Sequence, residues 1–247
     1  GIAAVLYWTI VIAFIAMLIA VPMSILAALA LTEYAPMRLR KPLTSLVDLL
    51  AAIPSLIYGL WGLFFLQEKL VPLAEWISSF FGWIPIFAVE GEQFTQSSFM
   101  AGVVVALMVL PVTTSVMREV FSQAPPGEKE AALALGSTRW GMIRTVVLPF
   151  GRGGIIGGSM LGLGRALGET IAVALIISPI FEINLNWLHT GSNSVASLIA
   201  LRFGEANEAA LAALMAAGLS LFVLTLVVNM LASRIVSRSR SGSGVEL

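Results

Sequence analysis

The chain has 247 residues, of which 58% are hydrophobic and only 11% are charged. Soluble domains usually carry about 25% charged residues, so this composition excludes an ordinary soluble protein. The 14 basic and 14 acidic residues cancel, which leaves no net charge to attract nucleic acid. Cysteine is absent and histidine occurs once, which excludes disulfides and thiol catalysis and argues against a zinc or haem centre.

Long apolar stretches indicate the class of protein. A helix needs about 20 apolar residues to cross a hydrocarbon core of roughly 30 Å, whereas barrel strands would alternate apolar and polar residues. We therefore expect an all-α integral membrane protein, a polytopic bundle with five transmembrane helices in this chain. The expected spans are residues 2–31, 43–66, 97–117, 153–181 and 209–232, which contain only Asp48, Arg165 and Glu169 as charged residues.

Lys and Arg residues concentrate in alternate connections between these spans. They are Arg38, Arg40, Lys41, Arg118, Lys129, Arg139, Arg144, Arg152, Arg234, Arg238 and Arg240. The opposite connections hold Lys69 and Arg202 among many glutamates. By the positive-inside rule the basic side is cytoplasmic, which predicts a multi-pass protein of the cytoplasmic membrane. Because five spans that end inside must begin outside, and the chain starts at Gly1, we expect at least one further span before it.

The segments outside the spans have distinct compositions. Residues 67–96 interleave aromatic residues with prolines and glutamates, which favours an interfacial anchoring hairpin over a substrate gate. Residues 182–207 are rich in Asn and Ser, and His189 there is expected to be solvated. The tail 237–247 is rich in Ser, Gly and Arg and is expected to be a disordered cytoplasmic tail after a transmembrane domain covering 1–236.

The cytoplasmic connection 121–150 predicts two short helices. Pro125 and Pro126 can only begin a helix, and Gly136 supplies a stop. A second helix fits from Ser137, as its cap, to Pro149, with an apolar stripe of Trp140, Ile143 and Val147. Such a projection suits a groove on a cytoplasmic partner, although a loop lying on lipid headgroups would have a similar composition.

The same connection carries a resemblance to a known family. The residues Glu130, Ala131, Ala132, Gly136, Val146, Leu148 and Pro149 resemble the EAA loop of ABC importer permeases, with Val146 in place of the usual isoleucine. The segment GLGRALGETIAVALIIS from Gly162, together with LTEYAP at 31–36 and VNMLA at 228–232, resembles the phosphate permeases of that family. The resemblance implies a core of six spans, the first of which would precede Gly1, and an EAA loop whose coupling helices dock on an ATP-binding subunit.

The fourth apolar run is the expected substrate path. Gly154, Gly158 and Gly162 recur every four residues, and at roughly 100° per residue Arg165 and Glu169 fall on the same helical face. Charges inside a membrane usually face a bundle interior or an aqueous path, so this stripe is expected to line an interface with a second permease subunit. Arg165 and Glu169, with the adjacent Thr170, are the expected anion path, but a purely structural Arg165–Glu169 ion pair would give the same pattern. Asp48 is interpreted as an interfacial carboxylate.

Two classes of function remain open on these residues. The resemblance implies a membrane permease for inorganic phosphate, not itself an enzyme, that works with a paralogous permease, two ATP-binding subunits and an external phosphate-binding protein. No Gly-Lys pair of a P-loop is present, so ATP and magnesium would be bound by the partner subunits and this chain would hold no cofactor. A permease for another oxyanion, such as sulfate or molybdate, fits the same spacing, whereas a membrane-embedded enzyme would need a nucleophile and base that the spans do not supply.

Overall fold

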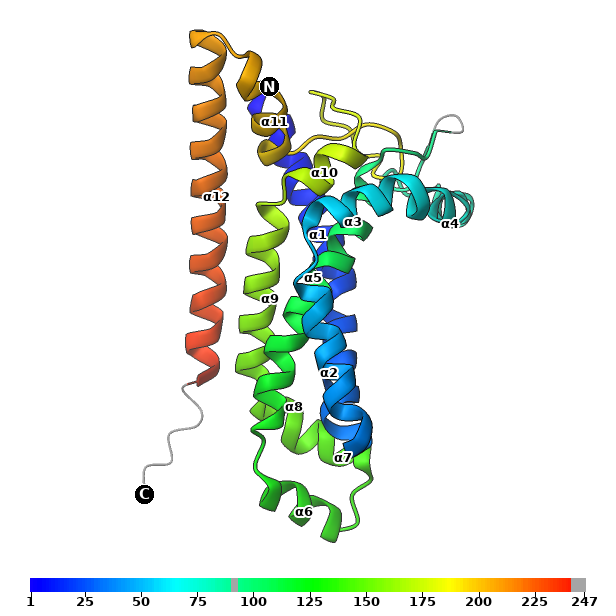
Figure 1. The fold of residues 1–247 in the computed structure, drawn as a ribbon, viewed down its shortest axis with the longest axis vertical. Helices are drawn as coiled ribbons and strands as arrows, with labels where there is room; N and C mark the ends of the chain where they lie inside the picture. The colour runs from blue at the N-terminus through cyan, green and yellow to red at the C-terminus, as the bar shows by residue number, and fades with distance from the viewer. Residues whose placement is uncertain (90–92, 241–247) are drawn as a thin grey trace. The chain divides into compact units, whose positions relative to one another are not determined.

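The structure, a computed structural model, describes residues 1–89 and 93–240. Within this part of the chain it contains helices and isolated β-bridges but no β-strand, so the predicted all-α membrane class is confirmed (Figure 1). The α-helices are α1 Ile2–Leu29, α2 Met37–Ala51, α3 Ser55–Trp61, α4 Gln67–Phe81, α5 Ser98–Ser122, α6 Pro126–Ala134, α7 Arg139–Met142, α8 Leu148–Phe150, α9 Arg152–Leu167, α10 Ile171–Ile176, α11 Val195–Arg202 and α12 Glu208–Arg240. Short π-helical or 3-10 segments extend some of them: η1 Ala30–Tyr34, η2 Gly62–Leu66, η3 Ile143–Val147 and η4 Phe203–Glu205.

Among the described residues, four continuous helical segments are long and apolar enough to cross a membrane. They are Ile2–Tyr34, Ser55–Phe81, Ser98–Ser122 and Glu208–Leu231. A fifth crossing would be the pair Arg139–Phe150 and Arg152–Leu167, which is bent by 66° at its break. The first, third and fifth apolar runs of the sequence therefore coincide with long helices.

The second apolar run does not form one helix, contrary to the prediction for 43–66. Helix α2 ends at Ala51, and a new helix begins after Pro54. Proline has no amide hydrogen to donate and disfavours a helical conformation in the residue before it, so the helix breaks although the run stays apolar. From Ser55 the helix continues through η2 and α4 to Phe81, beyond the predicted end at residue 66.

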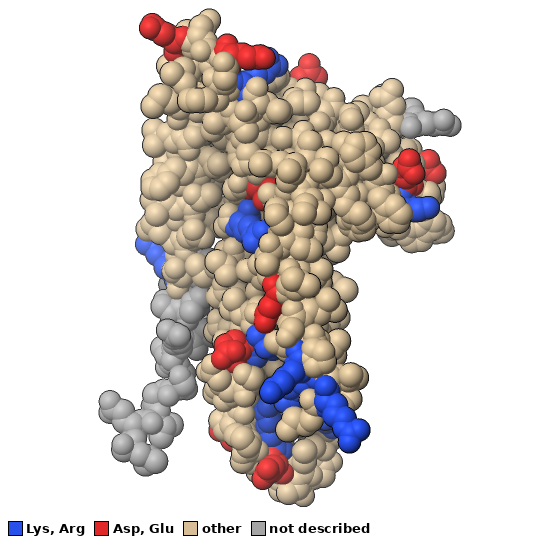
Figure 2. Space-filling view, viewed as in Figure 1, with Lys and Arg blue, Asp and Glu red and all other residues tan. Residues whose placement is uncertain are grey.

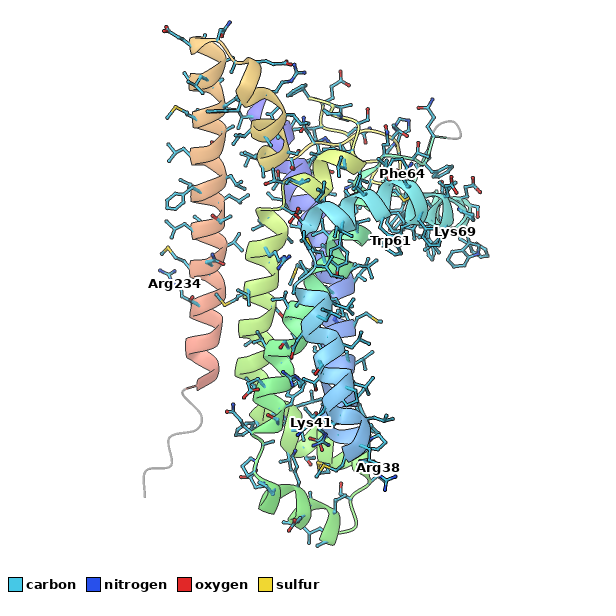
Figure 3. The ribbon with its side chains drawn as sticks, viewed as in Figure 1. Arg38, Lys41, Trp61, Phe64, Lys69 and Arg234 are labelled. Atoms are coloured by element: carbon cyan, nitrogen blue, oxygen red, sulfur yellow. The ribbon has the colours of Figure 1, made fainter. Side chains whose placement is uncertain are left out.

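The segment 67–96, expected to be an interfacial hairpin, begins instead with helix α4. This helix exposes Trp76 and Phe80, and Trp83 beyond it is also exposed. Trp61 and Phe64 project from the same α3–α4 segment, which also carries Lys69 (Figure 3). Exposed aromatic rings next to a lysine are typical of a helix at the headgroup level, so the anchoring role is retained as an interpretation.

The prediction of a disordered tail over 237–247 is wrong for its first four residues. Residues 237–240 belong to helix α12, which ends at Arg240. The remainder of the tail, 241–247, and residues 90–92 lie outside the described residues.

The chain divides into two compact units. The first contains residues 1–19, 53–109 and 163–227. Its core includes Trp8, Val11 and Ile15. The polar loop 177–194 is fixed to this core because the indole nitrogen of Trp187 donates to the Tyr7 hydroxyl (3.0 Å), and the indole nitrogen of Trp8 donates to the Glu182 carbonyl (2.9 Å). His189, expected to be solvated, is half-buried in this loop.

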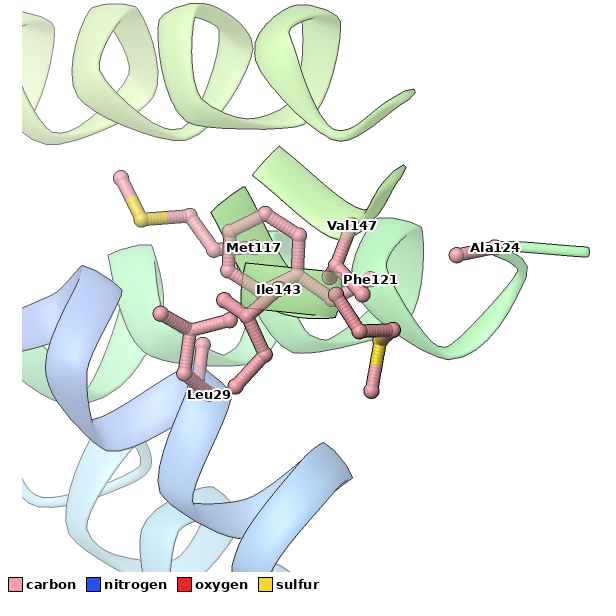
Figure 4. Packing of buried hydrophobic residues seen from close by; sticks show 8 residues of the cluster. Leu29, Met117, Phe121, Ala124, Ile143 and Val147 are labelled. Atoms are coloured by element: carbon pink, nitrogen blue, oxygen red, sulfur yellow. The ribbon is translucent and has the colours of Figure 1, made fainter. Parts of the chain in front are cut away.

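The second unit contains residues 20–52, 110–162 and 228–247, of which 241–247 are outside the described part. Its core joins the end of α1, α5 and the helices α7 and η3 (Figure 4). The buried side chains are Ala28, Leu29, Met117, Phe121, Ala124, Met142, Ile143 and Val147. Ser24 on α1 donates to the Leu110 carbonyl on α5 (3.1 Å) and also bonds the Thr113 hydroxyl, which adds a polar link between the two helices.

Candidate functional site

The predicted substrate residues lie at a break in the fourth apolar run. The prediction of one helix over 153–181 is wrong, because α9 ends at Leu167 and α10 covers only Ile171–Ile176. Gly168, a poor helix former, is exposed at the break, and Thr170 donates its hydroxyl hydrogen to the Gly168 carbonyl (3.1 Å). In lipid, non-helical backbone is tolerated only where it is buried in protein or lines water. Inside a membrane, the break would therefore have to be buried in protein or lie next to water.

Arg165 and Glu169 do not form the ion pair that the spacing suggested. Because α9 ends between them, a separation of four residues no longer places them one turn apart on a single helix. Glu169 is buried, and its carboxylate accepts the amide hydrogen of Ala172 (3.2 Å), which satisfies a free N–H in the first turn of α10. The ion pairs found among the described residues involve other side chains.

Arg165 is held in the last turn of α9, where a cation is favoured by the helix dipole. It is partly exposed and interacts electrostatically with Tyr58 of α3. Helix α3 lies very close to α10, because a Cβ added at Gly59 would be 2.8 Å from the Cα of Ala172. The break and α3 thus bring Tyr58, Arg165 and Glu169 into one region of the first unit, and Tyr58 is a residue that the sequence reasoning missed.

Gly154 and Gly158 of α9 pack against another helix of the same chain. A Cβ on Gly154 would meet Val120 at 2.5 Å, and a Cβ on Gly158 would meet Met117 at 3.2 Å. Both positions thus face α5 of the same chain, whereas we expected their stripe to face a second subunit. Small residues permit close approach to any neighbouring helix, so their spacing alone does not identify the neighbour. Gly162 lies on the same helix and is buried.

The connection 121–150 forms two helical segments joined at Gly136. Gly136 has φ +82°, and the amides of Gly136 and Ser137 donate to the carbonyls of Leu133 (3.0 Å) and Ala132 (3.1 Å). This is the Schellman arrangement, in which the left-handed residue closes the helix end. The following helix is capped by Thr138, whose hydroxyl accepts the amide hydrogen of Gly141 (3.1 Å), and not by Ser137 as predicted.

The two segments present one buried and one exposed side. Ile143 and Val147 are fully buried in the core of the second unit, but Trp140 of the predicted stripe is 54% exposed. Ala132 and Leu148 pack against that core as partly buried residues. Glu130, Ala131, Gly136 and Pro149 are exposed, together with the apolar side chains of Leu133 and Leu135, which are 46% and 89% exposed.

Basic residues gather at the end of the second unit (Figure 2). Lys129 of α6 donates to the carboxylate of Glu33 in η1 at 2.6 Å, and both side chains are largely buried. Arg118 lies 3.9 Å from Asp48, which also accepts the hydroxyl hydrogen of Ser115 (3.0 Å). The sequence reasoning missed the Lys129–Glu33 pair because its members are 96 residues apart and no local spacing signals their contact.

Comparison with known proteins agrees with this architecture. The family described as the binding-protein-dependent transport system inner membrane component matches residues 20–241. The chain belongs to this family. The permease is 44% identical over 230 residues to the phosphate transport system permease protein PstC 2 of Mycobacterium tuberculosis, covering 92% of this chain and 71% of the relative. It is also 44% identical to PstC of Haemophilus influenzae over 241 residues, covering 96% of this chain and 76% of the relative.

Solved structures support the fold of the permease. A methionine ABC transporter, MetNI, in an inward-facing conformation matches with a TM-score of 0.62 at 17% identity, covering 97% of this chain and 94% of that chain. A bacterial ABC transporter that imports alginate matches with a TM-score of 0.68 at 21% identity, covering 96% and 79%. The permease is thus the multi-pass membrane component of an ABC transporter, a class that works with an ATPase and a substrate-binding partner.

Proposed function

We propose that this permease imports inorganic phosphate across the bacterial cytoplasmic membrane. The observation that carries the proposal is its 44% identity, over 92% or more of its length, to phosphate permeases of Mycobacterium tuberculosis and Haemophilus influenzae. The proposed complex contains a paralogous PstA-like permease, two PstB-like ATP-binding subunits and an external PstS-like phosphate-binding protein. ATP and magnesium belong to the ATP-binding subunits, and this chain holds no cofactor of its own.

The proposed anion path passes the break between α9 and α10. The Arg165 guanidinium is permanently charged and can make paired hydrogen bonds to phosphate oxygens. Arg165 forms no ion pair with Glu169, which supports this role because phosphate would not have to displace a carboxylate before binding the guanidinium. Glu169 then acts as a positioning residue that holds the start of α10, and Thr170 is the neutral hydroxyl neighbour.

The proposed coupling element is the pair of short helices joined at Gly136. Glu130, Ala131 and Pro149 lie on its exposed side, while Ala132 and Leu148 anchor it to the core. The exposed side chains of Leu133 and Leu135 support docking into a groove of an ATP-binding subunit, because such apolar exposure outside the membrane favours a protein partner over water.

Transport by the reconstituted complex tests the anion path. Uptake of labelled phosphate into vesicles, driven by ATP and loaded binding protein, should be lost in Arg165→Ala while the complex still assembles. Arg165→Lys should also be poor, because it keeps the charge but loses the planar fork. Arg152→Ala is the matched control, since Arg152 begins the same helix and is exposed there. Near-normal uptake by the double variant Arg165→Leu, Glu169→Leu would reject the anion path.

The identity of the anion needs a separate measurement. Sulfate and molybdate have the same tetrahedral shape, so Arg165 alone does not select among them. Excess unlabelled sulfate or molybdate should leave phosphate uptake unchanged. Strong competition by either would show that the transporter also accepts that oxyanion, which would contradict selectivity for phosphate and leave the permease assignment intact.

A further inference from the structure

A polar pocket lies in the second unit. It is bounded by η1, α2, α5 and α6. The side chains that matter for binding are Thr32, Glu33, Arg40, Thr44, Arg118 and Lys129. Lys129 is paired with Glu33, and Arg118 is paired with Asp48 outside the lining, so Arg40 is the one cation of the lining that has no carboxylate partner among the described residues.

Several hydrogen-bond donors in this pocket remain uncommitted. The Nε atom of Arg118 is buried and has no hydrogen-bond partner among the described residues. Arg40 uses one terminal nitrogen to donate to the Thr32 carbonyl (2.5 Å), which leaves its other N–H groups free within the described part of the chain. The Thr44 hydroxyl makes no hydrogen bond in that same part. A buried guanidinium nitrogen without a protein partner is costly, so we expect an acceptor beside it, either a water molecule or an anion.

The lining of the pocket favours one kind of acceptor. Two guanidinium groups, an ammonium group and the Thr44 hydroxyl line one small space beside the Glu33 carboxylate, and all but that carboxylate can donate hydrogen bonds. A phosphate group offers several acceptor oxygens and at least one negative charge, and it pairs with Arg through parallel hydrogen bonds. We propose that this pocket binds a phosphate group on the cytoplasmic side of the membrane, as free inorganic phosphate or as the headgroup of an anionic phospholipid.

Binding in this pocket would act on the second unit as a whole. Lys129 belongs to α6 and is held by Glu33 of η1. A phosphate group in the pocket offers Lys129 a second acceptor and joins α6 to Arg40 of α2 and Arg118 of α5. A bound phosphate group therefore holds α6 more firmly against α2 and α5. These residues lie outside the proposed anion path, so binding in this pocket does not require phosphate to be the transported substrate.

The test uses the assembled transporter in nanodiscs, with the external binding protein omitted. All proteins carry Arg165→Ala, so that phosphate bound in the proposed path does not contribute. The pocket variant is Arg40→Gln with Thr44→Val. The matched control is Arg38→Gln with Lys41→Gln, which removes two charges from the same exposed end of α2 but outside the pocket lining (Figure 3).

Two measurements distinguish the sources of the phosphate group. In nanodiscs of neutral lipid, labelled inorganic phosphate should bind the control and bind the pocket variant at least about tenfold more weakly. In mixed lipid, native mass spectrometry should find anionic phospholipid retained by the control and lost from the pocket variant. Either difference supports the site and identifies its source. Equal behaviour of the two variants in both measurements overturns the proposal, and a circular dichroism spectrum matching the control checks that the pocket variant is folded.

Discussion

The Lys129–Glu33 pair is expected to hold α6 against the second unit. The two charged atoms are 2.6 Å apart, and the side chains are 19% and 9% exposed. At an effective dielectric constant near 20, such a pair attracts by about 6 kcal/mol before desolvation is subtracted. Exposed pairs are worth about 0.2–1 kcal/mol net, and breaking a fully buried pair costs about 3–5 kcal/mol. Glu33→Gln should therefore cost about 2–3 kcal/mol.

The pair formed by Arg118 and Asp48 is the natural comparison in the same unit. Its atoms are 3.9 Å apart and the Asp48 side chain is 50% exposed, so solvent screens the attraction. Asp48→Asn should cost less than about 1 kcal/mol. The asparagine oxygen can still accept the hydrogen bond from Ser115, which keeps the change to one of charge alone.

Hydrogen exchange of the purified permease measures this difference directly. If opening of α6 breaks the Lys129–Glu33 pair, a loss of 2–3 kcal/mol speeds exchange of the α6 amides by roughly 30- to 150-fold. Asp48→Asn should change the exchange rate of the α6 amides by less than about fivefold. The double variant Glu33→Gln, Lys129→Met should recover part of the protection, because no charge is then left buried and unpaired. Equal exchange in Glu33→Gln and Asp48→Asn would refute the reasoning.

The remaining predictions concern the glycines and the orientation. Gly136→Val should loosen the turn between the two short helices by about 1–2 kcal/mol, because valine strains at φ +82°, and should weaken pull-down of the ATP-binding subunit without reducing membrane insertion. Gly59→Val should lower the Tm of the purified permease by overpacking against Ala172, at a cost of about 1–3 kcal/mol; an unchanged Tm would show that α3 and α10 separate freely. A cysteine placed at the exposed residue Glu205 should react with an impermeant thiol reagent in intact cells, whereas one at Leu135 should not; labelling at Leu135 would reverse the assigned orientation.

Local signals made the two short helices predictable from sequence. Pro126 stands at the start of α6, and Gly136 adopts the left-handed conformation that closes it. Both effects depend on the backbone of a few neighbouring residues, so they hold whatever the tertiary environment. The cap was misplaced by one residue, at Ser137 instead of Thr138, because both hydroxyl side chains suit that position.

The breaks in the second and fourth apolar runs could not be found by counting apolar residues. Hydropathy reports the solvent around a segment and not the continuity of its helix. Pro54 gave a local signal for the first break, but Gly168 resembles many other glycines of α9 that remain helical. Helical spacing then placed Arg165 and Glu169 on one face, and the structure corrected this by ending the helix between them.

The exposed leucines of the short helices have a consequence for biosynthesis. Leu133 and Leu135 are exposed on the folded chain by itself. A copy made in excess of its ATP-binding subunits would expose this apolar surface to quality-control proteases and chaperones, which recognise exposed apolar side chains. We expect the cell to remove such orphan copies, so that the abundance of the permease follows the abundance of its partner even when its own synthesis is raised.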